Sequence, residues 1–196
     1  TYNVIRSVTI CKQLVILTHF HYNATTMTPL DILQNKFGYN SFRANQEEVI
    51  MRTLNNQDSF VLMPTGGGKS LCYQIPALIF KGLTIVISPL IALMKDQVDA
   101  LRVNGIEAAY LNSSSTDEER ASIFKALEAG RLKLLYVAPE RLFGAGEFLT
   151  FIKKYPISLF AIDEAHCISS WGHDFRPEYR QLARLKKEFP GVPTIA

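Results

Sequence analysis

The sequence predicts an α/β domain of three layers, built on a mainly parallel β-sheet. Residues 83–87, 132–138 and 157–162 are apolar runs with little polar alternation, as expected for strands buried on both faces. Amphipathic stretches separate these runs, and strands that alternate with helices form parallel sheets covered by helices. The length of 196 residues fits one such domain. We therefore expect ligands to bind beyond the carboxyl ends of the strands.

The first strands and helices are expected to follow a short N-terminal helix. That helix begins near Met27, because Thr28 can cap it and Pro29 suits the first helical position. The next expected elements are a strand at 59–63, a helix at 69–80 ended by Gly82, a strand at 83–87 stopped by Ser-Pro, and a helix at 90–103 ended by Asn-Gly.

The second half of the chain continues the same alternation. A helix is expected over residues 116–129, with Ser115 and Glu118 in the spacing of a capping box and Gly130 at its end. The other expected elements are strands at 107–111, 132–138 and 157–162 and a helix at 177–189.

Residues 1–26 are expected to be an N-terminal extension of unknown role, and residues 27–196 the folded domain. The apolar run at residues 14–17 is too short to span a bilayer or to form the core of a signal peptide. No membrane partner is expected.

Composition narrows the class of protein without naming a function. With 47% hydrophobic and 20% charged residues, the chain has the make-up of a packed globule. Its net charge of +3 permits a nucleic-acid partner but does not indicate one. Its 3 cysteines are far apart in the sequence, which gives no disulfide framework and favours a reducing compartment.

Residues 63–70 read Met-Pro-Thr-Gly-Gly-Gly-Lys-Ser and predict a loop that binds phosphate. Glycines let backbone N–H groups approach an anion, while Lys69 can reach the β- and γ-phosphates and Ser70 can bind Mg²⁺. Met63 stands where the general pattern has glycine, so a glycine-rich turn beside an exposed lysine is the alternative. Under the first interpretation the nucleotide contacts are Thr65, Gly66, Gly67, Gly68, Lys69 and Ser70.

Two adjacent carboxylates, Asp163 and Glu164, follow the last apolar strand. Such a pair is costly at the end of a buried strand unless it holds a cation or faces solvent. Asp163 can anchor Mg²⁺ opposite Ser70, and Glu164 can orient and deprotonate the attacking water. A solvated loop is the alternative for this pair alone. Together with the glycine loop, the pair predicts an NTPase with Lys69, Asp163 and Glu164 as catalytic residues.

Residues 163–166, Asp-Glu-Ala-His, have the DEAH form of the second helicase motif. From about Leu30 to Ala196 the chain resembles the first RecA-like domain of bacterial-type RecQ-family DNA helicases, in superfamily two. That family has methionine at the position of Met63. The resemblance implies a RecA-like P-loop NTPase fold, ATP and Mg²⁺ as cofactors, and DNA as a partner.

An upstream motif of this family recognises adenine, and residues 37–46 resemble it. By this resemblance Gln46 hydrogen-bonds the adenine edge, and an aromatic side chain and an arginine flank the base; an amide has suitable geometry for this pairing. The residues concerned are Phe37, Tyr39, Arg43 and Gln46. A helix N-terminus with a packed aromatic pair is the alternative.

Three further stretches resemble family motifs that contact DNA. Residues 88–97 and 136–142 resemble motifs Ia and Ib, which makes Ser88 and Arg141 candidates for phosphate contacts. Residues 168–180 resemble the aromatic-rich loop that links DNA binding to ATP hydrolysis. In that loop the coupling and base-stacking candidates are Trp171, His173, Phe175 and Arg176. By the same resemblance His166 of the DEAH motif bridges the ATP site to this loop or to the second domain. Core packing is the alternative for each aromatic residue. A zinc site at His166, Cys167 and His173 is disfavoured by their spacing.

The resemblance implies an ATP-dependent DNA helicase of DNA repair and recombination. It implies single-stranded and junction or forked DNA as partners and movement from 3′ to 5′. The sequence stops where motif III of the family continues, so a second RecA-like domain is expected in cis and this piece is expected to be poorly active alone. The expected location is the bacterial cytoplasm with the nucleoid, or the nucleus in a eukaryote. A DNA-stimulated translocase and a non-catalytic nucleotide-dependent interaction domain are the alternatives.

Overall fold

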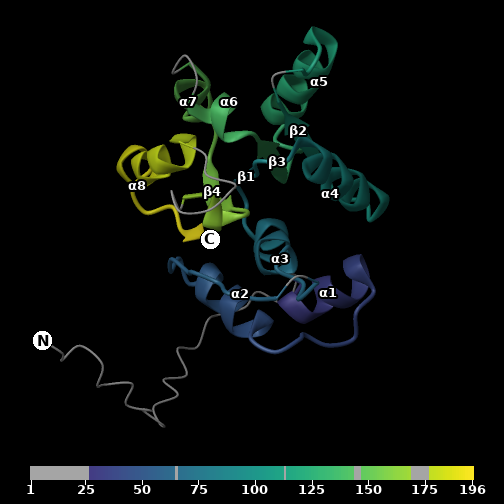
Figure 1. The fold of residues 1–196 in the computed structure, drawn as a ribbon. Coiled ribbons are helices and arrows are strands. Elements are labelled where there is room, and N and C mark those ends of the chain that lie inside the picture. Colours follow the sequence, from purple (N-terminus) through teal and green to yellow (C-terminus); the bar gives the residue numbers. More distant parts are fainter. Residues whose placement is uncertain (1–26, 65, 113, 144–146, 169–176) are drawn as a thin grey trace, which may run out of the picture.

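The computed structural model describes residues 27–64, 66–112, 114–143, 147–168 and 177–196. Within these residues, five parallel strands form one sheet in the order β2-β3-β1-β4-β5 (Figure 1). They are Leu83–Ile87 (β1), Ala108–Leu111 (β2), Leu134–Val137 (β3), Ile157–Ile162 (β4) and Thr194–Ile195 (β5). The predicted parallel sheet is confirmed. No helix in the described part of the chain combines the length and the apolar character needed to cross a membrane.

Helices cover both faces of the sheet, which completes the three predicted layers. Helices α3 and α4 pack on one face, and α5 to α8 pack on the other (Figure 1). The helices are Pro29–Phe37 (α1), Gln46–Leu54 (α2), Leu71–Ile79 (α3), Ile91–Val103 (α4), Asp117–Glu128 (α5), Pro139–Phe143 (α6), Glu147–Ile152 (α7) and Ala183–Glu188 (α8), with 3₁₀ turns at Ala165–Ile168 (η1) and Pro177–Leu182 (η2).

Strand β1 shows why the two faces are both apolar. Ile85 and Ile87 belong to the core under α5 to α8, while Val86 between them belongs to the core under α3 and α4. Side chains alternate across a strand, so a strand with helices on both sides must be apolar at every position. All five residues of β1 are buried accordingly.

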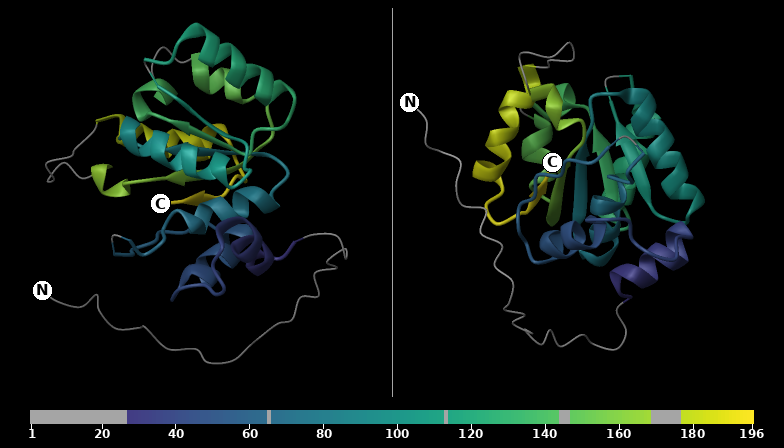
Figure 2. Two further views of the ribbon diagram at one scale, coloured as in Figure 1. Left: turned by 90° about the vertical axis from the view of Figure 1, so that its right-hand side faces the viewer. Right: turned by 60° about the horizontal axis from the view of Figure 1, so that its bottom comes forward.

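Helices α1 and α2 form an outer layer against α3, on the side away from the sheet (Figure 2, left). Ile32, Leu33 and Ile50 pack there on Ile75 of α3. Helix α1 begins as predicted, because the Thr28 hydroxyl accepts the Asp31 N–H at 3.1 Å and the Asp31 carboxylate accepts the Thr28 N–H at 2.8 Å. This outer layer brings the start of α2 to the glycine loop.

The strand predicted at residues 59–63 is not formed as a strand. Ser59 makes one isolated parallel bridge to Ile195, and the Ser59 N–H donates to the Thr194 carbonyl at 2.9 Å. The Val61 N–H donates to the Ala196 carbonyl at 2.7 Å. The partner strand β5 has only 2 residues within the described part of the chain, so it supports no longer ladder.

Two predicted helix details were also wrong. The capping box of α5 uses Thr116 and Glu119, whose side chains each accept the other's N–H, at 3.2 and 2.8 Å. Ser115 does not cap the helix because its hydroxyl instead bonds Asn112. The helix predicted over 177–189 is divided into η2 and α8, and 3₁₀ turns of this kind are frequent at helix ends.

Candidate active site

The glycine loop runs from residue 63 into α3, and its backbone conformation requires glycine. Gly66 and Gly68 have φ angles of 76° and 79°, in the left-handed region that side-chain-bearing residues rarely adopt. A Cβ atom on Gly67 would lie 2.8 Å from the Pro64 carbonyl oxygen. Thr65, predicted to contact the nucleotide, lies outside the described residues.

One side of the loop is tied to the start of α2. The Arg43 guanidinium donates to the Gly66 carbonyl at 2.5 Å, and Gln46 Nε2 donates to the Gly68 carbonyl at 3.0 Å. Gln46 Oε1 accepts the backbone N–H of Arg43 at 2.8 Å, and the Gln46 side chain is only 1% exposed. The amide of Gln46 therefore has hydrogen-bond partners at both its oxygen and its nitrogen, and it links the start of α2 to the loop.

The residues predicted to contact the base largely meet at this side. A cavity of about 120 Å³ is lined by Tyr39, Arg43, Gln46, Gly66 and Gly68, among others. Phe37 does not line this cavity. It packs instead against the apolar clusters around α3, as the alternative of a packed aromatic pair expected for this residue.

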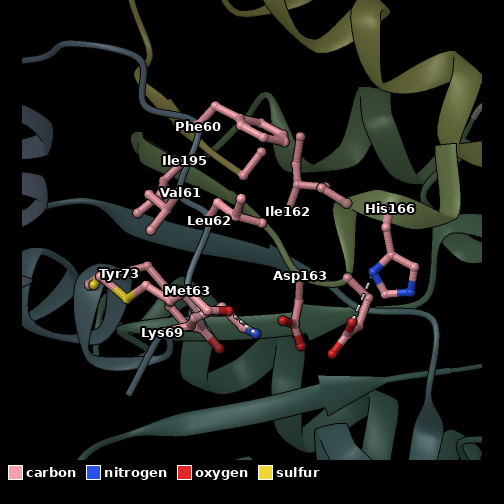
Figure 3. A pocket seen from close by; sticks show the side chains of 14 residues that line it. Phe60, Val61, Leu62, Met63, Lys69, Tyr73, Ile162, Asp163, His166 and Ile195 are labelled. Atoms are coloured by element: carbon pink, nitrogen blue, oxygen red, sulfur yellow. Dashed lines mark hydrogen bonds and ion pairs between the residues drawn. The ribbon is translucent and has the colours of Figure 1, made fainter. Parts of the chain in front are cut away.

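The other side of the loop faces the predicted carboxylates. A cavity of about 180 Å³ is lined by Lys69, Asp163, Glu164 and His166, with apolar side chains of residues 60–63 on its wall. Figure 3 shows the side chains of Lys69 and Asp163 directed toward one another across it. The Lys69 ammonium lies 3.4 Å from the Met63 carbonyl oxygen. Ser70 follows Lys69 at the start of α3 and does not line the cavity.

The Asp163 carboxyl is electrostatically unfavourable as an anion in this structure. Burial raises the pKa of Asp163, and the neighbouring negative charge of Glu164 raises it further. The Ser88 hydroxyl donates to Asp163 Oδ2 at 3.4 Å, which with Lys69 lowers the pKa again but does not reverse the balance. A further positive charge beside Asp163 would therefore stabilise its ionised form.

Glu164 has a strained backbone. Its φ angle is 51°, and a non-glycine residue in the left-handed region costs about 1–3 kcal/mol. Its carboxylate lies 3.2 Å from Nδ1 of His166, the contact drawn as a dashed line in Figure 3. Strain of this kind is commonly found at functional sites, where the surrounding structure maintains it.

The donors at this site fit a magnesium ion that is bound together with phosphates. Mg²⁺ is usually held by one or two carboxylates, waters and substrate phosphates. Within the described residues no group of three or more His, Cys, Asp or Glu side chains could hold a metal by itself. Asp163, with its raised pKa and the adjacent Glu164, supplies the carboxylate that such a partly formed site requires.

The predicted DNA-contact residues have different outcomes. Ser88 is 1% exposed and bonded to Asp163, so the prediction that its hydroxyl contacts a DNA phosphate does not fit this structure. Ser88 is buried because it directly follows β1, next to the end of β4. Arg141 lies on α6 with its guanidinium 5.8 Å from the ring centre of Phe148. The other predicted DNA residues, Trp171, His173, Phe175 and Arg176, lie outside the described residues.

Sequence reasoning missed a set of buried hydroxyl groups near the site. The Tyr73 and Tyr136 hydroxyls lie 3.4 Å apart, and burial raises the pKa of Tyr136 to about 12. The Tyr179 hydroxyl donates to the Asp163 carbonyl at 2.9 Å. In the sequence these tyrosines fall at apolar positions of strands and helices, so their only signal is that of core residues.

A glycine loop that ends in Lys-Ser, facing two strand-end carboxylates on a parallel sheet, defines a nucleotide-binding domain of the P-loop class. Comparison with known proteins gives the family. The model of the DEAD/DEAH box helicase family matches residues 43–195, and the chain belongs to this family.

Relatives named ATP-dependent DNA helicase RecQ confirm the resemblance that the motifs predicted. The chain is 59% identical to that of Pasteurella multocida over 177 residues, covering 90% of this chain and 28% of the relative. It is also 59% identical to that of Haemophilus influenzae over 169 residues, covering 86% and 27%. The chain thus spans little more than a quarter of the length of these relatives.

A solved structure shows the same fold at low sequence identity. The DUF1998 helicase MrfA, crystallised with DNA and AMPPNP, superimposes with a TM-score of 0.67 at 18% identity. The match covers 89% of this chain and 26% of that one. The RecA-like α/β architecture expected from the sequence is therefore confirmed.

Proposed function

We propose that this chain is the ATP-hydrolysing motor domain of a DNA helicase. One observation carries the proposal: Lys69 of the glycine loop and the carboxylates Asp163 and Glu164, about a hundred residues later in the sequence, line one cavity. The enzymes named RecQ that resemble this chain are described as ATP-dependent, which supports ATP as the nucleotide.

The polar groups that line the cavity, together with Ser70 beside it, have distinct tasks in this proposal. Lys69 leaves the Met63 carbonyl to bind the β- and γ-phosphates, and Ser70 with Asp163 would hold Mg²⁺. The ion neutralises charge on the phosphates when it is bound. Glu164 accepts the proton of the attacking water, and His166, paired with its carboxylate, links the site to the DNA side.

In this proposal the base binds at the cavity between the glycine loop and the start of α2. Tyr39 and Arg43 line it and flank adenine. Gln46 contacts the adenine edge after giving up its longer bond, 3.4 Å, to the Gly67 carbonyl. Because Gln46 already supports the loop through Gly68, the same side chain joins base binding to loop conformation.

The full-length protein is proposed to couple hydrolysis to the unwinding of DNA from 3′ to 5′. A second RecA-like domain in cis completes the γ-phosphate site with arginine, which adds on the order of 10³–10⁵ in rate in related phosphoryl-transfer enzymes. Single-stranded and forked DNA contact residues 171–176, where Trp171 and Phe175 stack on unpaired bases. Arg176 and Arg141 add positive charge, and His173 belongs to the same coupling segment.

The test uses the full-length protein with single-stranded and forked DNA. The proposal expects ATP hydrolysis that single-stranded DNA stimulates, together with separation of the forked strands. Stimulated hydrolysis without strand separation would favour a translocase. No stimulation by DNA, in a protein that hydrolyses ATP, would contradict the helicase assignment. Trp171→Ala is expected to lower the stimulated rate and to spare the basal rate.

A further inference from the structure

The turn formed by Asp163 and Glu164 is held by hydrogen bonds at three of its backbone groups. The Asp163 N–H donates to the Ile87 carbonyl of β1 at 2.8 Å, and the Glu164 carbonyl accepts the Cys167 N–H at 2.9 Å. The Asp163 carbonyl accepts the hydroxyl of Tyr179 at 2.9 Å. The last of these bonds comes from a side chain, so one substitution can remove it without altering the backbone.

The carbonyl that Tyr179 binds belongs to the peptide that precedes Glu164. The orientation of this peptide relative to the Glu164 side chain is the φ angle of Glu164, which is 51°. A side-chain-bearing residue leaves that region unless neighbouring groups restrain it. The Tyr179 hydroxyl bonded to the Asp163 carbonyl is such a restraint, and it helps to set the direction of the Glu164 carboxylate.

Tyr179 itself is rigidly placed. Its side chain is 1% exposed and belongs to the core cluster that also contains Phe160 of β4 and Leu182 of η2. A buried hydroxyl requires a hydrogen-bond partner, so the bond to Asp163 stabilises both groups. Packing fixes the position of the ring, and the hydrogen bond from its hydroxyl therefore restrains the Asp163 carbonyl.

We propose that Tyr179 is a positioning residue, which holds Glu164 in the orientation needed to activate the attacking water. This inference rests on the function proposed above. Tyr179 does not touch the nucleotide or the water; it acts through the peptide between Asp163 and Glu164. Removing its hydroxyl lets Glu164 relax toward ordinary backbone angles and moves the carboxylate away from the water.

The experiment compares Tyr179→Phe with wild type in the full-length protein. The variant keeps the packed ring and loses only the hydroxyl. We expect kcat for ATP hydrolysis to fall by about 10- to 100-fold, the scale of a displacement near 1 Å in an active site. The KM for ATP should change less than about two-fold, because the glycine loop is untouched. Tyr155→Phe is the matched control, since that ring packs against the same core, and it should leave kcat unchanged.

A purely structural role for Tyr179 is distinguished by repeating the substitution in a Glu164→Gln background. If Tyr179 acts through Glu164, the second substitution adds less than about two-fold to the loss, because the two residues form one unit. An equal fall in both backgrounds, or an unchanged kcat in Tyr179→Phe, would overturn the inference alone. Normal hydrolysis by Glu164→Gln itself would instead remove the proposed role of Glu164, and the inference with it.

Discussion

The two sides of the glycine loop differ in how their polar groups are satisfied. Toward α2, the Gly66 and Gly68 carbonyls accept hydrogen bonds from Arg43 and Gln46, and the Gln46 amide has partners at both ends. Toward β4, Asp163 and Glu164 lie next to each other, and the pKa of Asp163 is raised by burial and by the charge of Glu164. The polar groups named on the α2 side are paired within the protein, whereas on the β4 side the charge of Lys69 does not offset the effect of burial and of Glu164 on the pKa of Asp163.

This difference indicates how the site divides its work. A fully bonded support keeps the loop in its left-handed conformation before any nucleotide arrives, which reduces the ordering that binding requires. Two adjacent carboxylates, one of them buried, favour a cation, so the free energy of cation binding includes relief of their repulsion. The α2 side therefore fixes the conformation of the glycine loop before binding, and the carboxylates on the β4 side favour the binding of Mg²⁺.

The largest expected effect on stability comes from a substitution of Gly68 that disrupts the hydrogen bonds of Gln46 to the loop. A Cβ atom there would lie 2.4 Å from Gln46 Nε2, and the φ angle is 79°. Gly68→Ala should lower the free energy of unfolding by about 1–3 kcal/mol more than a glycine substitution that meets no neighbour, because buried hydrogen bonds are lost. Chemical denaturation measures this loss of stability. Titration with an ATP analogue measures nucleotide affinity, which should fall as well.

Gly130→Ala is the matched control for Gly68→Ala. Gly130 also has a positive φ angle, 63°, but a Cβ atom there has no neighbour within 4 Å. This variant should show the backbone cost alone and bind nucleotide normally. If both variants bind nucleotide equally well, the support from Gln46 is not part of the site.

A smaller effect of opposite sign is expected on the carboxylate side. Asp163→Asn removes one of two adjacent negative charges and should raise the melting temperature without Mg²⁺ by about 2–4 °C, the change that ~1 kcal/mol produces in a domain of this size. Differential scanning calorimetry measures it. Asp96→Asn, at an exposed position on α4, should change stability by less than about 0.5 kcal/mol.

The same variant has a predicted pH dependence. Folding raises the pKa of Asp163 above its ordinary value of 3.8, so its contribution to stability is full below that value and is lost as pH rises through the folded-state pKa. The advantage of Asp163→Asn should therefore grow as pH increases through this range and stay constant above it. A constant advantage at every pH would contradict the assigned cause.

The smallest expected effect on the site comes from a distant cap. Thr116→Ala removes the capping box of α5 and should cost about 0.5–2 kcal/mol of stability. Nucleotide affinity should stay unchanged, because α5 does not line either cavity. If nucleotide affinity falls together with stability in Thr116→Ala, the effects expected for the Gly68 and Asp163 variants would reflect general destabilisation and not the two sides of the loop. Thr116→Ser, which keeps the cap, is the control.

Much of this architecture could be predicted from the sequence. Strands 83–87 and 157–162 were predicted with their exact bounds, because apolar runs ended by Ser-Pro or by Asp-Glu give clear limits. The meeting of Lys69 with Asp163 followed from the rule that ligands bind at the carboxyl ends of parallel strands. These inferences depend on local pattern and on a general property of the fold.

Other features depend on packing that no local pattern records. Residues 59–63 look like a strand, but the strand is not formed because its partner β5 is so short in the described part of the chain. Ser88 follows a strand like a surface turn residue, yet it is buried against Asp163. Tyr179 has only the periodicity of a core residue, and its hydroxyl bond to Asp163 appears only once η2 is placed in space.

The central claim is that the glycine loop and the β4 carboxylates form one Mg²⁺–nucleotide site, in which Asp163 is the carboxylate that favours the cation. Calorimetric titration with a slowly hydrolysed ATP analogue, with and without Mg²⁺, tests it most directly. Mg²⁺ should raise the affinity of the wild-type chain by about 5- to 150-fold, the usual range of coupling between two ligands. This increase should be lost in Asp163→Asn. An equal increase in Asp163→Asn would contradict the account.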